Sequence, residues 1–382
     1  MSSLTAKNQL LIVLAGGGTG GHVTPALALA DAVTRELPGA QVLFIGTAHG
    51  LEATLVPKRG YRIELVEGQR IVGGGLAMKV KGISSLLRGI AQARAILKRE
   101  KPSIVIGVGG YASGAALLAA KTLGIATAVH ESNAVPGLTN KVLGRLVDRV
   151  YLGFAAAQPN FSNKISVISG NPVRAPIALV GPQRPPRQVG VAHILIVGGS
   201  QGSEFLNKQV PALLAEVSKL GVELEIRHQV GKLDAEPVRE AYAKAHLSVT
   251  TESFIDDMAA AYAWADFAIT RSGSGTVAEL AAAALPALLV PFPFAAGDHQ
   301  AANARVFAES GAGLWVRQAD WQAERLAKQV AEILQNVDVW TKASSASLAF
   351  AAPDAAGAVI RDCRNWLSKR GFSFPLSLQA VS

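Results

Sequence analysis

Residues 9–33 read QLLIVLAGGGTGGHVTPALALADAV, which is an aliphatic strand, a glycine turn and an alanine-rich helix in succession. The strand does not alternate polar and apolar residues, as is typical of a parallel strand that is covered on both faces. The same three-part pattern starts again at residues 192–217, AHILIVGGSQGSEFLNKQVPALLAEV. Because strand, crossover helix and strand is the repeating unit of a doubly wound fold, the sequence predicts two Rossmann-like domains that face each other across a cleft.

Further aliphatic runs predict the other strands of an α/β protein. Between the two halves lies APIALVGPQRPPRQVG, rich in proline and without periodicity, which predicts a linker at residues 175–190. The expected domains are therefore residues 1–174 and 191–354. The expected strands are 10–14, 41–45, 104–107, 126–130 and 149–152 in the first half, and 193–197, 223–229, 267–270 and 287–290 in the second.

The composition excludes several classes of protein. The chain has 382 residues, of which 49% are hydrophobic and 17% charged, and this opposes the signature of disorder. With Cys363 as the one cysteine, neither a disulfide scaffold nor a cysteine-rich zinc module can form. A single cysteine also fits a reducing compartment such as the cytoplasm.

The net charge of +9 favours nucleic acid, anionic membrane or phosphorylated substrates as partners. We expect no nucleic acid, because aromatic residues make up 6% of the chain and no binding module is recognisable. Two uncharged stretches, 102–120 and 280–297, approach the length of a membrane span. The first contains a glycine turn and the second three prolines, so we expect both to be buried strand-and-helix segments.

The glycine turn at residues 16–22, GGGTGGH, is the first candidate site. Glycines at a helix start let the backbone approach a phosphate, with amide donors and the helix dipole directed at it. Gly16, Gly18 and Gly21 also satisfy the G-x-G-x-x-G pattern of dinucleotide enzymes, but the next strand ends in VLFIGT, without the acidic residue that would bind a ribose. His22 is a candidate base near neutral pH, or alternatively a capping or phosphate-contacting residue.

The second half repeats this chemistry. RSGSGTVAE at residues 271–279 follows a predicted strand and starts a helix whose free amides suit a diphosphate. Glu279 would hydrogen-bond a pair of ribose hydroxyls, or alternatively form a salt bridge with Arg271. No metal site and no Asp-x-Asp pair for Mg²⁺ is recognisable, since Asp256 and Asp257 are adjacent and point differently.

Residues 76–101, LAMKVKGISSLLRGIAQARAILKREK, form a basic amphipathic stretch. Such stretches occur in peripheral membrane contacts. An ordinary crossover helix with a solvated charged face is the alternative.

Together the motifs resemble one family. It is the MurG family of GT-B glycosyltransferases, which transfer N-acetylglucosamine in bacterial peptidoglycan synthesis and so serve cell shape and division. The resemblance covers roughly residues 10–366. It rests on GGTGGH (17–22), GGYASG (109–114), HESN (130–133), GNPVR (170–174), GGSQG (198–202), FIDDMAAAYAWAD (254–266), RSGSGTVAE (271–279) and DHQAANA (298–304). Ser132 departs from the family, which often has glutamine there, and residues 373–382 extend past its core.

The resemblance implies a fold, substrates and site residues. It implies that residues 355–382 hold a C-terminal helix that crosses back to the first domain, plus a tail. The donor would be UDP-GlcNAc, bound by the second domain, and the acceptor lipid I, undecaprenyl-pyrophosphoryl-MurNAc-pentapeptide, bound by the first at the cytoplasmic face of the inner membrane. No cofactor and no metal is implied. The implied substrate-binding residues are Thr19, Gly20, Gly21, Asn133 and Arg174 around donor or acceptor pyrophosphate, Ser200, Ser274, Gly275, Thr276, Val277 and Ala278 for the diphosphate, Ile255 for uracil, Glu279 for the ribose and Gln300 for the sugar.

The implied reaction is an inverting transfer in which the C4 hydroxyl of MurNAc attacks the anomeric carbon of GlcNAc. His22 is the candidate base, and an aspartate or glutamate is the alternative. A membrane-borne acceptor also favours the membrane interpretation of residues 76–101. Three other functions stay open: a GT-B transferase with a glycolipid or macrolide-like acceptor, an NAD-dependent oxidoreductase, and a non-catalytic sugar-nucleotide sensor.

Overall fold

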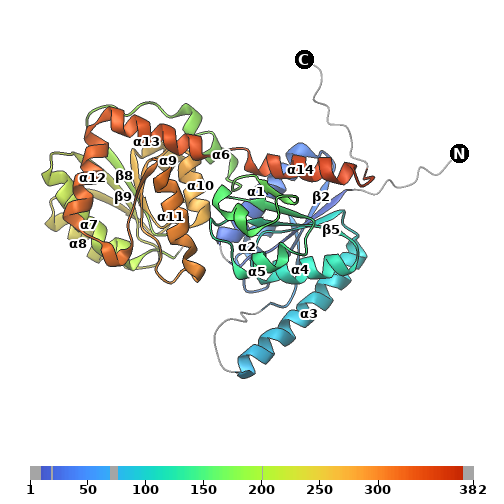
Figure 1. The fold of residues 1–382 in the computed structure, drawn as a ribbon. Coiled ribbons are helices and arrows are strands. Elements are labelled where there is room, and N and C mark those ends of the chain that lie inside the picture. The colour runs from blue at the N-terminus through green and yellow to red at the C-terminus, as the bar shows by residue number, and fades with distance from the viewer. Residues whose placement is uncertain (1–9, 19, 69–75, 200, 373–382) are drawn as a thin grey trace, which may run out of the picture. The chain divides into compact units, whose positions relative to one another are not determined.

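The computed structural model describes residues 10–18, 20–68, 76–199 and 201–372 (Figure 1). The chain divides into two units. The first takes the chain up to Pro172 together with the segment from Asp354 onward, and the second takes Val173–Pro353.

The described part of the first unit is a parallel sheet of seven strands in the order β3-β2-β1-β4-β5-β6-β7. Chain order reverses between the neighbours β1 and β4, which makes the carboxyl edge there the place where doubly wound sheets bind ligands. The elements are β1 (Leu11–Ala15), α1 (Gly20–Glu36), β2 (Gln41–Gly46), α2 (Glu52–Lys58), β3 (Arg62–Leu65), α3 (Leu76–Glu100), β4 (Ile104–Gly107), α4 (Tyr111–Thr122), β5 (Ala126–Glu131), α5 (Leu138–Leu143), β6 (Arg149–Leu152), β7 (Ser166–Ile168) and α14 (Ala355–Ser368).

Both faces of this sheet are covered, which explains why its central strands are uniformly aliphatic. Side chains alternate along β1, so Ile12 and Leu14 pack with α1 and α14 on one face. Val13 packs with α3 and α4 on the other. Figure 1 shows the same layering, with α1 and α14 on one side of the strands and α3, α4 and α5 on the other. The C-terminal helix α14 is therefore part of the first unit's core.

The second unit repeats the design. Its described strands form a parallel sheet in the order β10-β9-β8-β11-β12-β13, with the reversal between β8 and β11. Ile194 and Ile196 of β8 pack with leucines and valines of α7 and α12. The elements are α6 (Ala175–Ala178), β8 (Ala192–Val197), α7 (Glu204–Lys219), β9 (Leu224–Gln229), α8 (Glu236–Lys244), β10 (Val249–Glu252), α9 (Met258–Trp264), β11 (Phe267–Thr270), α10 (Ser274–Ala282), β12 (Ala287–Leu289), α11 (His299–Glu309), β13 (Gly313–Trp315), α12 (Ala323–Gln335) and α13 (Val337–Phe350).

The segment expected as a linker, residues 175–190, is instead packed on the second unit. It begins with α6, and Arg184 donates hydrogen bonds to the carbonyl oxygens of Ala283 (2.6 Å), Ala265 (2.8 Å) and Tyr262. Burial lowers the pKa of Arg184 to about 10. Proline here restricts the backbone of an anchored segment, and the boundary between the units falls earlier, at Pro172 and Val173.

By length and composition, one stretch of the described chain would be able to cross a membrane, Val337–Ser368. It consists of α13 and α14, and the helical conformation is interrupted between them at residues 351–354, where Pro353 lies. Trp340 of α13 belongs to the core of the second unit, whereas Val359 and Ile360 of α14 belong to that of the first. The apolar side chains of this stretch therefore serve two folded cores.

Candidate functional site

In the second unit, α10 starts at the carboxyl edge of the sheet directly after β11. Its N-cap is Gly273, which has no side chain to bond the first-turn amides, and the first turn has no acidic residue. The amides of Ser274, Gly275 and Thr276 and the positive end of the helix dipole are thus available to an anion.

The next two predicted residues continue α10. The Val277 amide already donates to the carbonyl of Gly273 (3.0 Å) and its side chain is buried, and Ala278 follows it in the helix. The anion-binding capacity of this helix start therefore lies in its first three residues.

Glu279, one turn into α10, is buried and holds two partners within the second unit. Arg174 donates from Nε to Oε1 (3.0 Å) and from Nη2 to Oε2 (3.2 Å), and the hydroxyl of Tyr262 donates to Oε2 (3.2 Å). Burial raises the pKa of Glu279, and the charge and hydrogen bonds of Arg174 oppose that rise. The carboxylate is thus held in one orientation by a planar guanidinium and a phenol.

The alternative prediction, a salt bridge between Glu279 and Arg271, is wrong. Arg271 donates instead to the carbonyl oxygens of Val290 and Pro291 at 3.1 Å each, and its guanidinium lies 5.6 Å from the ring centroid of Phe292. Burial lowers the pKa of Arg271 to about 10. These hydrogen bonds join the segment after β11 to the segment after β12.

The remaining predicted residues of this unit also lie beyond strand ends. Gln300 is the second residue of α11, and its Oε1 accepts from the backbone amide of Phe292 (2.9 Å). This bond occupies Oε1 of the side chain. Its carbonyl accepts from the hydroxyl of Ser272 (2.9 Å), which ties α11 to the start of α10. Ile255 follows β10 and its side chain is buried, so the backbone is the part of this residue left for recognition.

In the first unit, two glycine loops meet at the reversal between β1 and β4. The Gly17 amide donates to the carbonyl of Gly109 (3.2 Å), and a Cβ on Gly110 would collide with the Gly17 carbonyl. The ring of His22, in the first turn of α1, lies against Gly109, where any side chain would overlap it. Nδ1 of His22 lies 3.1 Å from the Gly17 carbonyl oxygen. The loops thus fix an imidazole at the ligand-binding edge of the sheet.

The HESN motif after β5 positions a loop of the same unit. Glu131 is buried, and its carboxylate accepts from the backbone amide of Asn133 (2.8 Å), from the Asn133 side chain (3.2 Å), from Gly137 (3.2 Å) and from Asn140 (2.8 Å). His130 is fully buried with Nε2 3.2 Å from the Gly170 carbonyl, and burial lowers its pKa to about 4. Glu131 therefore holds the loop that presents Asn133, and His130 ties the end of β5 to Gly170.

The other predicted site residues are located as follows in the two units. Gly20 and Gly21 are the first two residues of α1. Thr19 and Ser200 lie outside the described residues. Arg174 belongs to the second unit, and the first unit holds His22, Gly20, Gly21 and Asn133.

Two residues that contact the predicted site residues were not predicted from the sequence. Glu52 is buried and accepts from the Gly18 amide (2.6 Å), and Tyr262 is the phenol on Glu279. Glu52 could have been found as the first acidic residue after β2, six residues beyond the end of a strand that itself ends without one. The signal for Tyr262 was a polar aromatic within an alanine-rich helix.

The basic amphipathic stretch is helix α3, which extends beyond the rest of the first unit at its N-terminal end (Figure 1). Near its C-terminal end, Ile96 and Leu97 are buried against the sheet, as in a crossover helix. Leu87 is 62% exposed, and the neighbouring Arg88 pairs with Glu67 at 2.7 Å. The helix thus has a core-facing half and an exposed apolar position beside a basic one.

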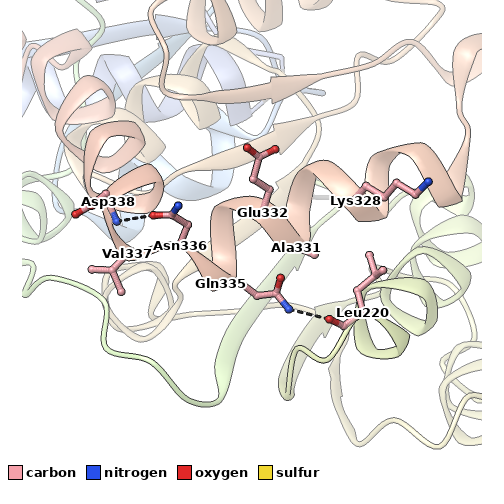
Figure 2. Close-up of a pocket in the computed structure, with 8 residues that line it drawn as sticks. All are labelled: Leu220, Lys328, Ala331, Glu332, Gln335, Asn336, Val337 and Asp338. Carbon is pink, nitrogen blue, oxygen red and sulfur yellow. Dashed lines mark hydrogen bonds between the residues drawn. The ribbon is translucent and has the colours of Figure 1, made fainter.

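A hollow in the second unit lies away from these residues. It is lined by the C-terminal end of α12, the start of α13 and Leu220 after α7 (Figure 2). Gln335 bridges it by donating to the Leu220 carbonyl (2.8 Å), and Asn336 caps α13. Since α7 runs back from the carboxyl edge of the sheet, its C-terminal end marks the opposite edge, which is not where such sheets bind ligands.

Asp257, one of the two adjacent aspartates weighed for a metal, caps α9 by accepting from the amide of Ala260 (2.9 Å). Asp298, in the DHQAANA motif, pairs with Arg317 at 2.6 Å. In the ranges that the structure describes, no three His, Cys, Asp or Glu side chains gather as a metal site.

Comparison with known proteins agrees with this architecture. Residues 12–152 match the glycosyltransferase family 28 N-terminal domain, and residues 193–359 match the C-terminal domain of the same family. The predicted fold class, GT-B with two Rossmann-like parallel-sheet domains, is confirmed.

Curated relatives align with nearly the whole chain. A protein of Geobacter sp. (strain M21) is 40% identical over 350 residues, which cover 91% of this chain and 94% of that protein. One of Acidithiobacillus ferrooxidans is 43% identical over 354 residues, covering 92% and 96%. Both are named UDP-N-acetylglucosamine--N-acetylmuramyl-(pentapeptide) pyrophosphoryl-undecaprenol N-acetylglucosamine transferase.

Solved structures give the same result. The crystal structure of Acinetobacter baumannii MurG superposes with a TM-score of 0.76 at 32% identity, covering 93% of this chain and 99% of that one. A glycosyltransferase of kitacinnamycin superposes with a TM-score of 0.68 at 18% identity, covering 94% and 99%, and shares the fold alone.

Proposed function

Because the chain belongs to glycosyltransferase family 28, we propose that it transfers N-acetylglucosamine from UDP-GlcNAc to the C4 hydroxyl of MurNAc in lipid I, the undecaprenyl-pyrophosphoryl-MurNAc-pentapeptide. The product is lipid II, the β-1,4-linked disaccharide precursor of peptidoglycan. These donor and acceptor groups are the ones in the names of the curated relatives.

The observation that carries the proposal is the start of α10. A helix N-terminus without a capping side chain or first-turn acid lies one turn before a buried, oriented carboxylate. The amides of Ser274, Gly275 and Thr276 would bind the diphosphate, and Glu279 would bind the ribose hydroxyls. Ser200 would complete the diphosphate set, whereas Val277 and Ala278 continue the helix and are not part of it, because the Val277 amide is already bonded to Gly273. The Ile255 backbone would bind uracil, and Gln300 would offer Nε2 to the sugar.

The departing UDP is an anion, and these groups would stabilise the charge that develops on it. Amide donors directed at a leaving group cost no reorganisation during the reaction and act strongly where water is excluded. Arg174 would turn from Glu279 to the pyrophosphate once ribose hydroxyls occupy the carboxylate, because a guanidinium matches phosphate geometry. We therefore propose a transfer that needs no metal.

His22 would remove the proton from the attacking C4 hydroxyl. The attack occurs on the face of the anomeric carbon opposite UDP, so the configuration inverts. Gly20, Gly21 and Asn133, with Thr19, would bind the acceptor pyrophosphate beside it. This choice rests on the position of the ring at the carboxyl edge of β1 and β4 and on its bond to Gly17.

We propose peripheral attachment at the cytoplasmic face of the inner membrane, through α3. A lipid-linked acceptor requires the enzyme to work at that surface. An exposed leucine beside basic residues on an amphipathic helix is suited to anionic headgroups.

Competition between acceptors tests the proposal. Purified enzyme with labelled UDP-GlcNAc is offered a water-soluble lipid I analogue, a diacylglycerol and a macrolide aglycone. We expect label on the lipid I analogue alone. Label on either other acceptor, with none on the lipid I analogue, would show that the acceptor class is wrong while the family assignment holds.

A further inference from the structure

We propose that Glu52 is a positioning residue that sets the tautomer of His22 through the peptide group between Gly17 and Gly18. The proposal rests on the function proposed above, in which His22 is the base. It concerns a buried carboxylate that neither the reaction nor the sequence motifs use.

One peptide group connects the two side chains. Its N–H, on Gly18, donates to Oε2 of Glu52 (2.6 Å). Its C=O, on Gly17, lies 3.1 Å from Nδ1 of His22. Carboxylate, peptide and imidazole therefore form a continuous hydrogen-bonded series across a single planar unit.

The direction of each bond follows from chemistry. A carbonyl oxygen accepts only, so Nδ1 of His22 must be the donor and must carry the proton. The neutral ring then has its lone pair on Nε2, which is the form that a base requires. Because hydrogen bonds in series polarise one another, the carboxylate also makes the Gly17 oxygen a stronger acceptor.

The site is shaped around Glu52. Oε1 accepts from the backbone amide and the hydroxyl of Thr47, at 2.9 Å each, so both carboxylate oxygens have donors. A Cβ on Gly17, Gly46 or Gly50 would overlap the Glu52 side chain. Three glycines thus leave room for one buried carboxylate directly beneath the loop.

The peptide needs such a partner because it joins two glycines. Gly17 and Gly18 have φ of 148° and 94°, and glycine accepts either orientation of the group at little cost. With the peptide reversed, an N–H would face Nδ1 of His22, the proton would move to Nε2, and the lone pair would be lost to the substrate. Glu52 selects the productive orientation.

Glu52→Gln is the discriminating change. The carboxamide oxygen is drawn to the two donors of Thr47, which leaves NH₂ against the Gly18 N–H. Two donors repel, so the reversed peptide becomes the favoured one. Glu52→Asp keeps the negative charge, but its shorter side chain places the carboxylate farther from the Gly18 amide. Glu64→Gln, on an exposed ion pair of the same unit, is the matched control.

The first measurement is ¹⁵N-histidine NMR of the full chain, with the His22 signals assigned by their loss in His22→Ala. We expect the Nδ1–H tautomer in the wild type, Glu52→Asp and Glu64→Gln, and the Nε2–H tautomer in Glu52→Gln. An Nε2–H wild type, or a tautomer unchanged in a folded Glu52→Gln, would overturn the inference.

The second measurement is kinetic. We expect kcat to fall between about tenfold and a hundredfold in Glu52→Gln with KM for UDP-GlcNAc unchanged, and less in Glu52→Asp. In a His22→Ala background Glu52→Gln should cost nothing more, because it acts through His22. A further loss there would overturn the inference. A fully active His22→Ala with the predicted tautomers would instead remove His22 as the base and leave the structural relationship standing.

Discussion

Arg174 and Glu279 form a bidentate ion pair inside the second unit, with Nε 3.0 Å from Oε1 and Nη2 3.2 Å from Oε2. The side chain of Glu279 is 11% exposed and that of Arg174 38%. The two groups proposed for ribose and pyrophosphate are therefore partners before any ligand arrives. The pair keeps the carboxylate charged and oriented in a buried place.

Replacing the carboxylate tests the ribose assignment. Glu279→Gln keeps the shape and removes the charge, so we expect the affinity for UDP to fall about tenfold to a hundredfold, as for a charged hydrogen bond. Calorimetry with UDP and with 2′,3′-dideoxy-UDP measures it, and Glu309→Gln on an exposed pair is the control. If Glu279→Gln still prefers UDP to the dideoxy compound as strongly as the wild type does, Glu279 does not bind the ribose.

Removing the arginine tests the energetics of the pair. Arg174→Met leaves Glu279 buried without its cation, and we expect the free energy of unfolding of the second unit to fall by about 2 kcal/mol at pH 7.5. Burial raises the pKa of Glu279, so the folded variant binds a proton more readily than the unfolded chain does. The deficit should therefore shrink as the pH falls toward 5.

Urea denaturation at both pH values measures this change. Glu279→Gln in the Arg174→Met background should restore most of the loss at pH 7.5. An equal deficit at both pH values would show that lost packing, and not the unpaired charge, is responsible.

Two buried histidines predict acid sensitivity. Burial lowers the pKa of His130 to about 4 and that of His228 to about 3, whereas the unfolded value is near 6.5. Their stabilisation is complete above pH 6.5 and is lost as the pH falls below it. For each histidine, the free energy of unfolding of its unit should be about 2 kcal/mol lower at pH 5 than at pH 7.5.

His228→Gln separates the two units. His228 lies 3.0 Å from the Tyr242 hydroxyl and 3.1 Å from Oδ1 of Asn207, with no exposure, so its protonation cannot be solvated. We expect the variant to reduce the pH dependence of the second unit alone, by guanidinium denaturation at the two pH values. His299→Gln, at a histidine of the same unit that is only half-buried, is the control, and a similar effect there would refute the burial argument.

The membrane assignment depends on an exposed leucine. Leu87→Asp should reduce binding to vesicles of phosphatidylglycerol and phosphatidylethanolamine severalfold in co-sedimentation, with transfer to a water-soluble acceptor unchanged. Leu220→Asp, an exposed leucine of the second unit, is the control. Equal losses in both variants would contradict a specific role for α3.

The sequence predicted the inner strands and missed the outer ones for a physical reason. All nine expected strands occur, to within a residue or so at their ends, because a strand covered on both faces must be an aliphatic run. The missed strands β3, β7, β10 and β13 are the edges of the two sheets. Their sequences RIEL, SVI, VTTE and GLW are partly exposed and mixed, so hydrophobicity does not distinguish them from loops.

In the candidate site, too, some features could be predicted from the sequence and others could not. Glycine turns and helix starts are local, and the sequence placed them at the carboxyl edges. Pairings between distant residues were not predictable, since Arg174 meets Glu279 over 105 positions and Glu52 reaches Gly18 over 34. Arg271, the candidate salt-bridge partner in the alternative interpretation of Glu279, was wrong because nearness in the sequence does not fix which side chains meet.

The most direct test is transfer of radiolabel from UDP-[¹⁴C]GlcNAc to a lipid I analogue, with EDTA present, by the wild type and by His22→Ala. We predict full transfer by the wild type in EDTA and a loss of about 10²- to 10⁴-fold in His22→Ala, with UDP binding intact. A wild type that ignores the acceptor or needs added metal would contradict the proposed reaction, and a His22→Ala enzyme as fast as the wild type would contradict the assignment of the base.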